Sequence, residues 1–163
     1  MKRGTKTALV TLLVLPVLAG IALATPGVNV ISAPVHSRGT HEGRLAVFSD
    51  KIHLKAKRGV DVDFVTQQIV IGPGGATGWH SHPGPVLVTV KSGALTLVYA
   101  DDATCDGKTY TAGQSFVDRG DETIHTALNK TPADVELWAT YLVPGAPGSP
   151  FRLDAPAQGS CGF

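Results

Sequence analysis

Three of the six histidines are the residues best suited to chemistry in this chain. His80 and His82 are separated by a single residue, and His125 follows at a distance that allows it to lie on a separate strand. Successive residues of a strand alternate between its two faces, so His80 and His82 would point to the same side. A later strand returning beside the first would bring His125 to them. Three imidazoles at one point predict a metal site.

Glycines frame the first two histidines in a recognisable pattern. The segment Gly74-Gly75-Ala76-Thr77-Gly78-Trp79-His80-Ser81-His82 is followed by Val86 and Gly93. This spacing resembles the first motif of the cupin family, which has glycine, five residues, His-x-His, then a glutamate and a second glycine. Gly74, His80, His82 and Gly93 match that motif. Val86 stands where the family has its glutamate.

A second group of residues resembles the other cupin motif. Gly113, His125 and Asn129 follow its order, with one extra residue inserted and Arg119 in place of a proline. The two motifs span residues 74–129, about a third of the chain. The resemblance implies an all-β fold, a single cupin or jelly-roll barrel, because cupins belong to that class.

The resemblance also implies a metal site formed by His80, His82 and His125. In most cupins of this kind the glutamate is the fourth ligand, and Val86 cannot bind a metal. A three-histidine site would leave open coordination positions, as a catalytic metal requires. Neutral imidazole suits Zn, Fe, Cu and Ni, and Mn less well.

Two functions remain open from the sequence. One is a small-molecule metalloenzyme of the oxygenase or isomerase type. The other is a non-catalytic extracellular module that binds a sugar or metabolite and keeps a degenerate metal site, which the loss of the glutamate at Val86 would fit. The fold alone does not choose between them, or say whether the protein is an enzyme.

The N-terminus has the pattern of a signal peptide. Lys2, Arg3 and Lys6 precede an uncharged apolar run over residues 8–24, and its small final residues predict cleavage before Thr25. Retention of this segment would instead leave a membrane anchor. In both cases the domain is expected outside the cytoplasm, secreted or in the periplasm or cell envelope.

Cys105 and Cys161 are the two cysteines of the chain. An even count in an exported protein favours a disulfide, which would hold the Pro- and Gly-rich tail, residues 146–163, against the domain. Thiolate metal ligands are the weaker alternative, because Cys105 is distant in sequence from both histidine motifs.

The remaining segments divide by composition. Residues 25–43 predict a linker or flexible arm, and residues 44–145 a barrel of short strands separated by Gly, Pro and Asp. Two of these strands, 86–91 and 94–99, are expected to form a hairpin around Gly93. The expected strands are Leu45–Phe48, Ile52–Lys55, Val62–Ile71, Gly78–His82, Val86–Lys91, Ala94–Tyr99, Lys108–Thr111, Gln114–Val117, His125–Asn129 and Val135–Val143.

The charge balance restricts the partners. The formal net charge is +1, and the chain has no run of clustered Lys and Arg of the kind that nucleic acids require. A small-molecule ligand or substrate is therefore the expected partner. Cupins often dimerise through edge strands, so a homodimer is a further expectation, although no particular patch marks it.

Overall fold

A computed structural model describes residues 24–158 and 161 of the chain. These residues form strands and no helix, which confirms the predicted all-β class. The strands are β1 Val28–Ser32, β2 Val35–His41, β3 Ala46–Phe48, β4 His53–Lys55, β5 Val62–Ala76, β6 His80–Ser81, β7 Val86–Ser92, β8 Ala94–Tyr99, β9 Lys108–Thr111, β10 Ser115–Asp118, β11 His125–Leu128, β12 Val135–Pro144 and β13 Leu153–Asp154.

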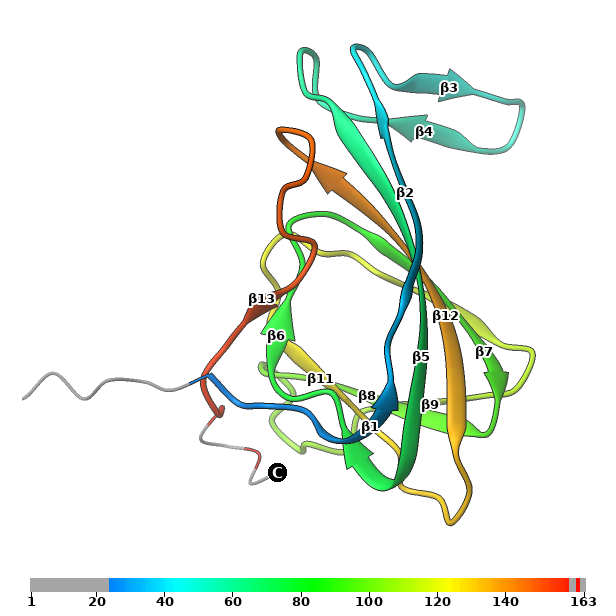
Figure 1. Cartoon of the computed structure of the whole chain (residues 1–163), viewed down its shortest axis with the longest axis vertical. Coiled ribbons are helices and arrows are strands. Elements are labelled where there is room, and N and C mark those ends of the chain that lie inside the picture. The colour runs from blue at the N-terminus through cyan, green and yellow to red at the C-terminus, as the bar shows by residue number, and fades with distance from the viewer. Residues whose placement is uncertain (1–23, 159–160, 162–163) are drawn as a thin grey trace, which may run out of the picture.

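One 11-stranded antiparallel sheet forms the body of the protein. Its main path is β10-β7-β12-β5-β11-β6-β13, with β1 and β2 paired to β5, and with β8 joining β11 to β9. The sheet curls back on itself, so that β5 and β12 stand across from β6 and β11 (Figure 1). Strands β3 and β4 make a separate hairpin that projects from one end of the barrel.

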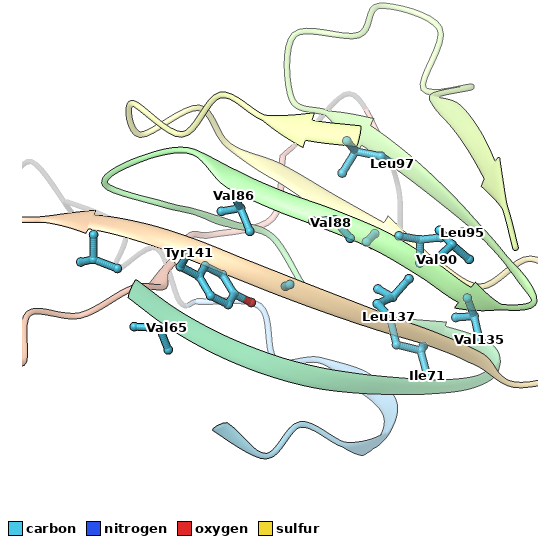
Figure 2. Packing of buried hydrophobic residues seen from close by; sticks show 13 residues of the cluster. Val65, Ile71, Val86, Val88, Val90, Leu95, Leu97, Val135, Leu137 and Tyr141 are labelled. Carbon is cyan, nitrogen blue, oxygen red and sulfur yellow. The ribbon is translucent and has the colours of Figure 1, made fainter. Parts of the chain in front are cut away.

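Alternating side chains of β7 and β12 fill much of the interior. Along β7, Val86, Val88 and Val90 are buried, whereas the residues between them are exposed. Strand β12 follows the same period of two, with Leu137 and Tyr141 among its inward residues. Figure 2 shows these side chains pointing into one cluster between the strands. The pleat therefore sets which residues reach the barrel interior.

The segment expected to be a flexible arm is paired with the sheet. Residues 28–41 form β1 and β2, which run antiparallel to β5. Every residue of β2 is exposed, so this edge strand has no buried face and no apolar alternation to reveal it in the sequence. Backbone pairing holds it, and Arg38 and Thr40 also donate hydrogen bonds to the buried Asp63 carboxylate, at 2.7 and 2.6 Å.

The predicted hairpin between residues 86–91 and 94–99 is wrong. Strand β7 pairs with β10 and β12, whereas β8 pairs with β9 and β11. The turn at Gly93 carries the chain from one part of the sheet to another. Gly93 has φ 77°, and a Cβ there would lie 2.7 Å from the Asp134 carbonyl oxygen. A glycine with positive φ occurs both in hairpin turns and in turns that lead to another part of a sheet, and the sequence alone does not distinguish these two kinds of turn.

The described part of the C-terminal tail is attached to the barrel. Cys105 and Cys161 form a disulfide, with a Cα–Cα distance of 5.6 Å. Before it, β13 pairs with β6, and Ala155 accepts a hydrogen bond from the backbone amide of Thr25 at 2.9 Å. The expected signal segment lies outside the described residues except for Ala24. In residues 24–158 and at 161, no helix has the length and apolar character needed to cross a bilayer.

Candidate metal centre

The structure brings together the three histidines singled out in the sequence. His80 lies on β6, His82 follows one residue after that strand, and His125 begins β11, where it pairs directly with His80. Their side chains are buried, with exposed fractions of 4–5%. One ring nitrogen from each lies within 4.8 Å of the others. The direct pairing of His80 with His125, together with the short separation of His80 and His82, brings the three rings together.

The other ring nitrogen of each histidine is fixed by the backbone. The Nδ1 atoms of His80, His82 and His125 lie 2.8, 2.6 and 3.1 Å from the carbonyl oxygens of Gly78, Phe151 and Thr123. A carbonyl oxygen only accepts hydrogen bonds, so each neutral ring carries its proton on Nδ1. The lone pair is then on Nε2 in all three rings, which is the arrangement that metal-binding histidines need.

Burial keeps these rings neutral. Desolvation is the main cause that lowers the pKa of His80 well below its ordinary value, and the nearby His125 and Arg152 lower it further. Desolvation also lowers the pKa of His82 to about 4 and lowers that of His125. All three imidazoles are therefore uncharged at neutral pH, with a single proton on each ring. Their lone pairs are available to a cation without prior loss of a proton.

The histidines line a small cavity inside the barrel. Its volume is about 50 Å³, and its walls are largely apolar, with Val86, Leu97 and Ala127 among them. A water molecule needs about 10–15 Å³ of such volume, so the cavity has room for an ion and a few small ligand atoms. Val86 is 2% exposed and faces this space as the motif predicted, but it offers no ligand atom.

A carboxylate that the sequence analysis missed also lines the cavity. Asp118, at the end of β10, is 2% exposed and pairs directly with Val86. Its Oδ1 accepts hydrogen bonds from the Tyr99 hydroxyl and the Gly120 amide, both at 3.3 Å. Its Oδ2 is buried without a hydrogen-bond partner among the described residues and lies 3.6 Å from His125 Nδ1.

The sequence alone does not mark Asp118 as a cavity residue. An aspartate that ends an otherwise ordinary strand looks like a turn residue, and its inward direction depends on the pairing of β10 with β7. Glu122, the other acid near His125 in sequence, is exposed. The acidic residue that faces the histidines is therefore not the one closest to them along the chain.

A second, larger pocket opens next to the cluster. It has a volume of about 400 Å³, and His80 is the member of the histidine cluster that it reaches. Residues of the N-terminal segment, including Thr25 and Val30, line it together with Phe151 and Arg152 near β13. Arg152 is held there by hydrogen bonds from its side chain to the Thr77 carbonyl and the Asp154 carboxylate, at 2.8 and 2.6 Å.

These residues fit a divalent metal ion. Three neutral imidazoles with fixed tautomers supply nitrogen ligands of the kind that Zn, Fe, Cu, Ni and Mn accept. The Asp118 carboxylate lines the same cavity, and one of its oxygens has no hydrogen-bond partner among the described residues. The disulfide is consistent with an oxidising compartment outside the cytoplasm.

Comparisons with known proteins give only weak structural similarities. No family model matches the chain, and no curated protein matches it in sequence. Among similar solved structures is an uncharacterised conserved protein with a double-stranded β-helix domain from Klebsiella pneumoniae, at 21% identity and a TM-score of 0.47. The match covers 58% of this chain and 76% of that one.

Two other solved structures are similar at the same level. A cupin domain from Bordetella pertussis is 19% identical with a TM-score of 0.39, and the match covers 61% of this chain and 93% of that one. A polyketide cyclase from Streptomyces resistomycificus is 18% identical with a TM-score of 0.44, and the match covers 56% of this chain and 59% of that one. With TM-scores below 0.5, these similarities assign no activity to the chain.

Proposed function

We propose that this protein binds one divalent transition-metal ion through His80, His82 and His125, and that it does so outside the cytoplasm. The observation that carries the proposal is the shared Nδ1 contact: each ring donates to a backbone carbonyl and so offers Nε2 to the same small space. Histidines that bind metals are typically oriented by such a hydrogen bond from the other ring nitrogen.

The proposed site would act on, or hold, a small molecule. Three histidines leave positions open on an ion, and a bound ion supplies Lewis acidity there. The ligand itself would occupy the 400 Å³ pocket and reach the site beside His80, because the 50 Å³ inner cavity is too small for more than a few atoms. Arg152 and Thr77 offer polar groups along that path. An oxygenase- or isomerase-type metalloenzyme is the activity we favour.

A second candidate is a non-catalytic module that binds a sugar or metabolite. The size of the outer pocket and its limited contact with the histidine cluster favour it. The two candidates differ in the effect of one substitution. His80→Ala abolishes turnover if the site is catalytic, whereas it leaves ligand binding largely intact if the pocket alone holds the ligand.

The direct test is elemental analysis of the exported, tag-free protein after reconstitution with iron, zinc, copper, nickel or manganese. We expect one equivalent of metal in the wild type and none in His80→Ala/His82→Ala. The matched control is His41→Ala/His53→Ala, which removes two exposed histidines and is expected to keep the metal. A wild-type protein that binds none of these ions would overturn the proposal.

The location is tested separately. The signal-like N-terminus and the disulfide support export. We expect the intact mass of the exported protein to correspond to a chain that begins at Thr25. A mass that includes residues 1–24 would show instead that the segment is kept as an anchor.

A further inference from the structure

One oxygen of the buried Asp118 carboxylate, Oδ2, has no explained role in the barrel. Its side chain is 2% exposed, yet Oδ2 has no hydrogen-bond partner among the described residues. A buried polar atom without a partner costs roughly 1–3 kcal/mol, and more when it is charged. A buried carboxylate with one free oxygen is therefore expected to serve something that the protein binds.

Strand register directs this carboxylate into the histidine cavity. Asp118 on β10 is the direct antiparallel partner of Val86 on β7. Directly paired residues of an antiparallel sheet project to the same face, and their Cβ atoms lie about 4.5–5.5 Å apart. Val86 and Asp118 both line the 50 Å³ cavity with the three histidines. The carboxylate absent at position 86 is thus present on the neighbouring strand.

Asp118 could be a metal ligand or could lie outside the ligand set, and the position of Oδ2 relative to His125 distinguishes these two roles. Oδ2 lies 3.6 Å from Nδ1, which is the ring nitrogen that faces the Thr123 carbonyl and not the one left for a metal. The cluster of potential ligand atoms contains the three histidines and not Asp118. The carboxylate is therefore placed outside the ligand set, where it can accept a hydrogen bond from a molecule inside the cavity.

We propose that Asp118 is an outer-sphere carboxylate of the metal centre: it contacts a metal-bound molecule without binding the ion itself. This inference rests on the proposed function. Its Oδ2 accepts a hydrogen bond from the water or ligand atom that occupies an open position beside the histidines. Its charge offsets one of the two positive charges of the ion, as the absent glutamate would. Asp118 thereby strengthens metal binding without being a ligand.

The experiment measures Co²⁺ affinity by competition with a chromophoric chelator at pH 7.5. Asp118→Asn keeps Oδ1 and its two hydrogen bonds but removes the charge and the free oxygen. We expect a dissociation constant about 10–100-fold higher than that of the wild type, as for other outer-sphere partners. Asp134→Asn removes one exposed carboxylate and is the control, with affinity expected to stay within twofold.

Two further measurements identify the role. The Co²⁺ absorption bands at saturation are expected to be the same in Asp118→Asn and the wild type, because the ligands are unchanged. The melting temperature of the metal-free variant is expected to equal or exceed that of the wild type, because an unpartnered buried charge is removed. If Asp118→Asn fails to fold, Asp118→Ser is held to the same thresholds of affinity and absorption, but not of melting temperature, because serine also loses the hydrogen bonds of Oδ1.

Several results would overturn the inference. Affinity unchanged within twofold would show that Asp118 does not serve the ion, and altered Co²⁺ bands would identify it as a direct ligand. A lower melting temperature of the metal-free variant with a matching loss of affinity would indicate a purely structural role. If the wild type binds neither Co²⁺ nor any of the five ions of the reconstitution test, the metal-site proposal fails. Wild-type binding with an unaffected Asp118→Asn variant refutes this inference alone.

Discussion

Removal of the disulfide should weaken both the fold and the metal site. The perturbation is Cys105→Ser/Cys161→Ser, which removes the cross-link without leaving a free thiol. The two cysteines are 56 residues apart in sequence. In the chain-entropy model, a closed loop of this length stabilises the folded state by about 4 kcal/mol, through restriction of the unfolded chain.

The structure indicates how the same change reaches the histidines. Cys161 is 2% exposed and packs with Trp79, which immediately precedes His80. The tail that it fixes contains Phe151, whose carbonyl oxygen lies 2.6 Å from Nδ1 of His82. That contact orients the ring and its tautomer, and loss of such a contact typically costs 10–100-fold in metal affinity. We expect a loss of about tenfold, because the pairing of β13 with β6 would still hold part of the tail.

The assay is urea unfolding of the metal-free protein, followed by tryptophan fluorescence, beside Co²⁺ affinity measured by chelator competition. Wild-type protein with its disulfide reduced is the control for the substitutions in the urea titration, where it should behave like the double-serine variant. A loss of unfolding free energy below 1 kcal/mol would refute the loop-closure reasoning. Unchanged Co²⁺ affinity would show that β13 holds Phe151 in place without the cross-link.

Three other outcomes follow from the structure. Because burial lowers the folded-state pKa of His82 to about 4, against about 6.5 in the unfolded chain, the unfolded state binds this proton first as the pH falls. His82 alone should cost the metal-free protein about 3 kcal/mol between pH 6.5 and 4 in urea titrations, and the lowered pKa values of His80 and His125 should add to this loss; a flat profile would contradict it. A metal ion at a free concentration of 100 times its dissociation constant should raise the free energy of unfolding by about 2.7 kcal/mol, and a chelator should reverse this increase. No increase would show that the histidines do not bind the ion. Gly120→Ala should lower the free energy of unfolding by about 3 kcal/mol in the same titrations. Gly120 has φ 69°, and an added Cβ would overlap the Gly84 backbone. A variant as stable as the wild type would show that the loop can shift.

Much of the fold could be predicted because its signals are local. Short runs rich in Val, Leu and Thr mark β7 and β12 in the sequence, and the predicted strands in residues 45–143 all appear. The strands that were missed, β1, β2 and β13, are exposed or very short. They depend on backbone hydrogen bonds to β5 and β6, which no side-chain pattern reports.

The candidate site divides in the same way. By itself, the sequence determined the residue types and the parity that puts His80 and His82 on one side, since neighbouring positions of a strand have fixed directions. Only the tertiary structure decided that His125 pairs with His80, that Asp118 stands opposite Val86, and that a carbonyl 69 residues away orients His82. These contacts depend on the register between distant strands, and a shift of one residue would turn the side chains of a strand to the opposite face.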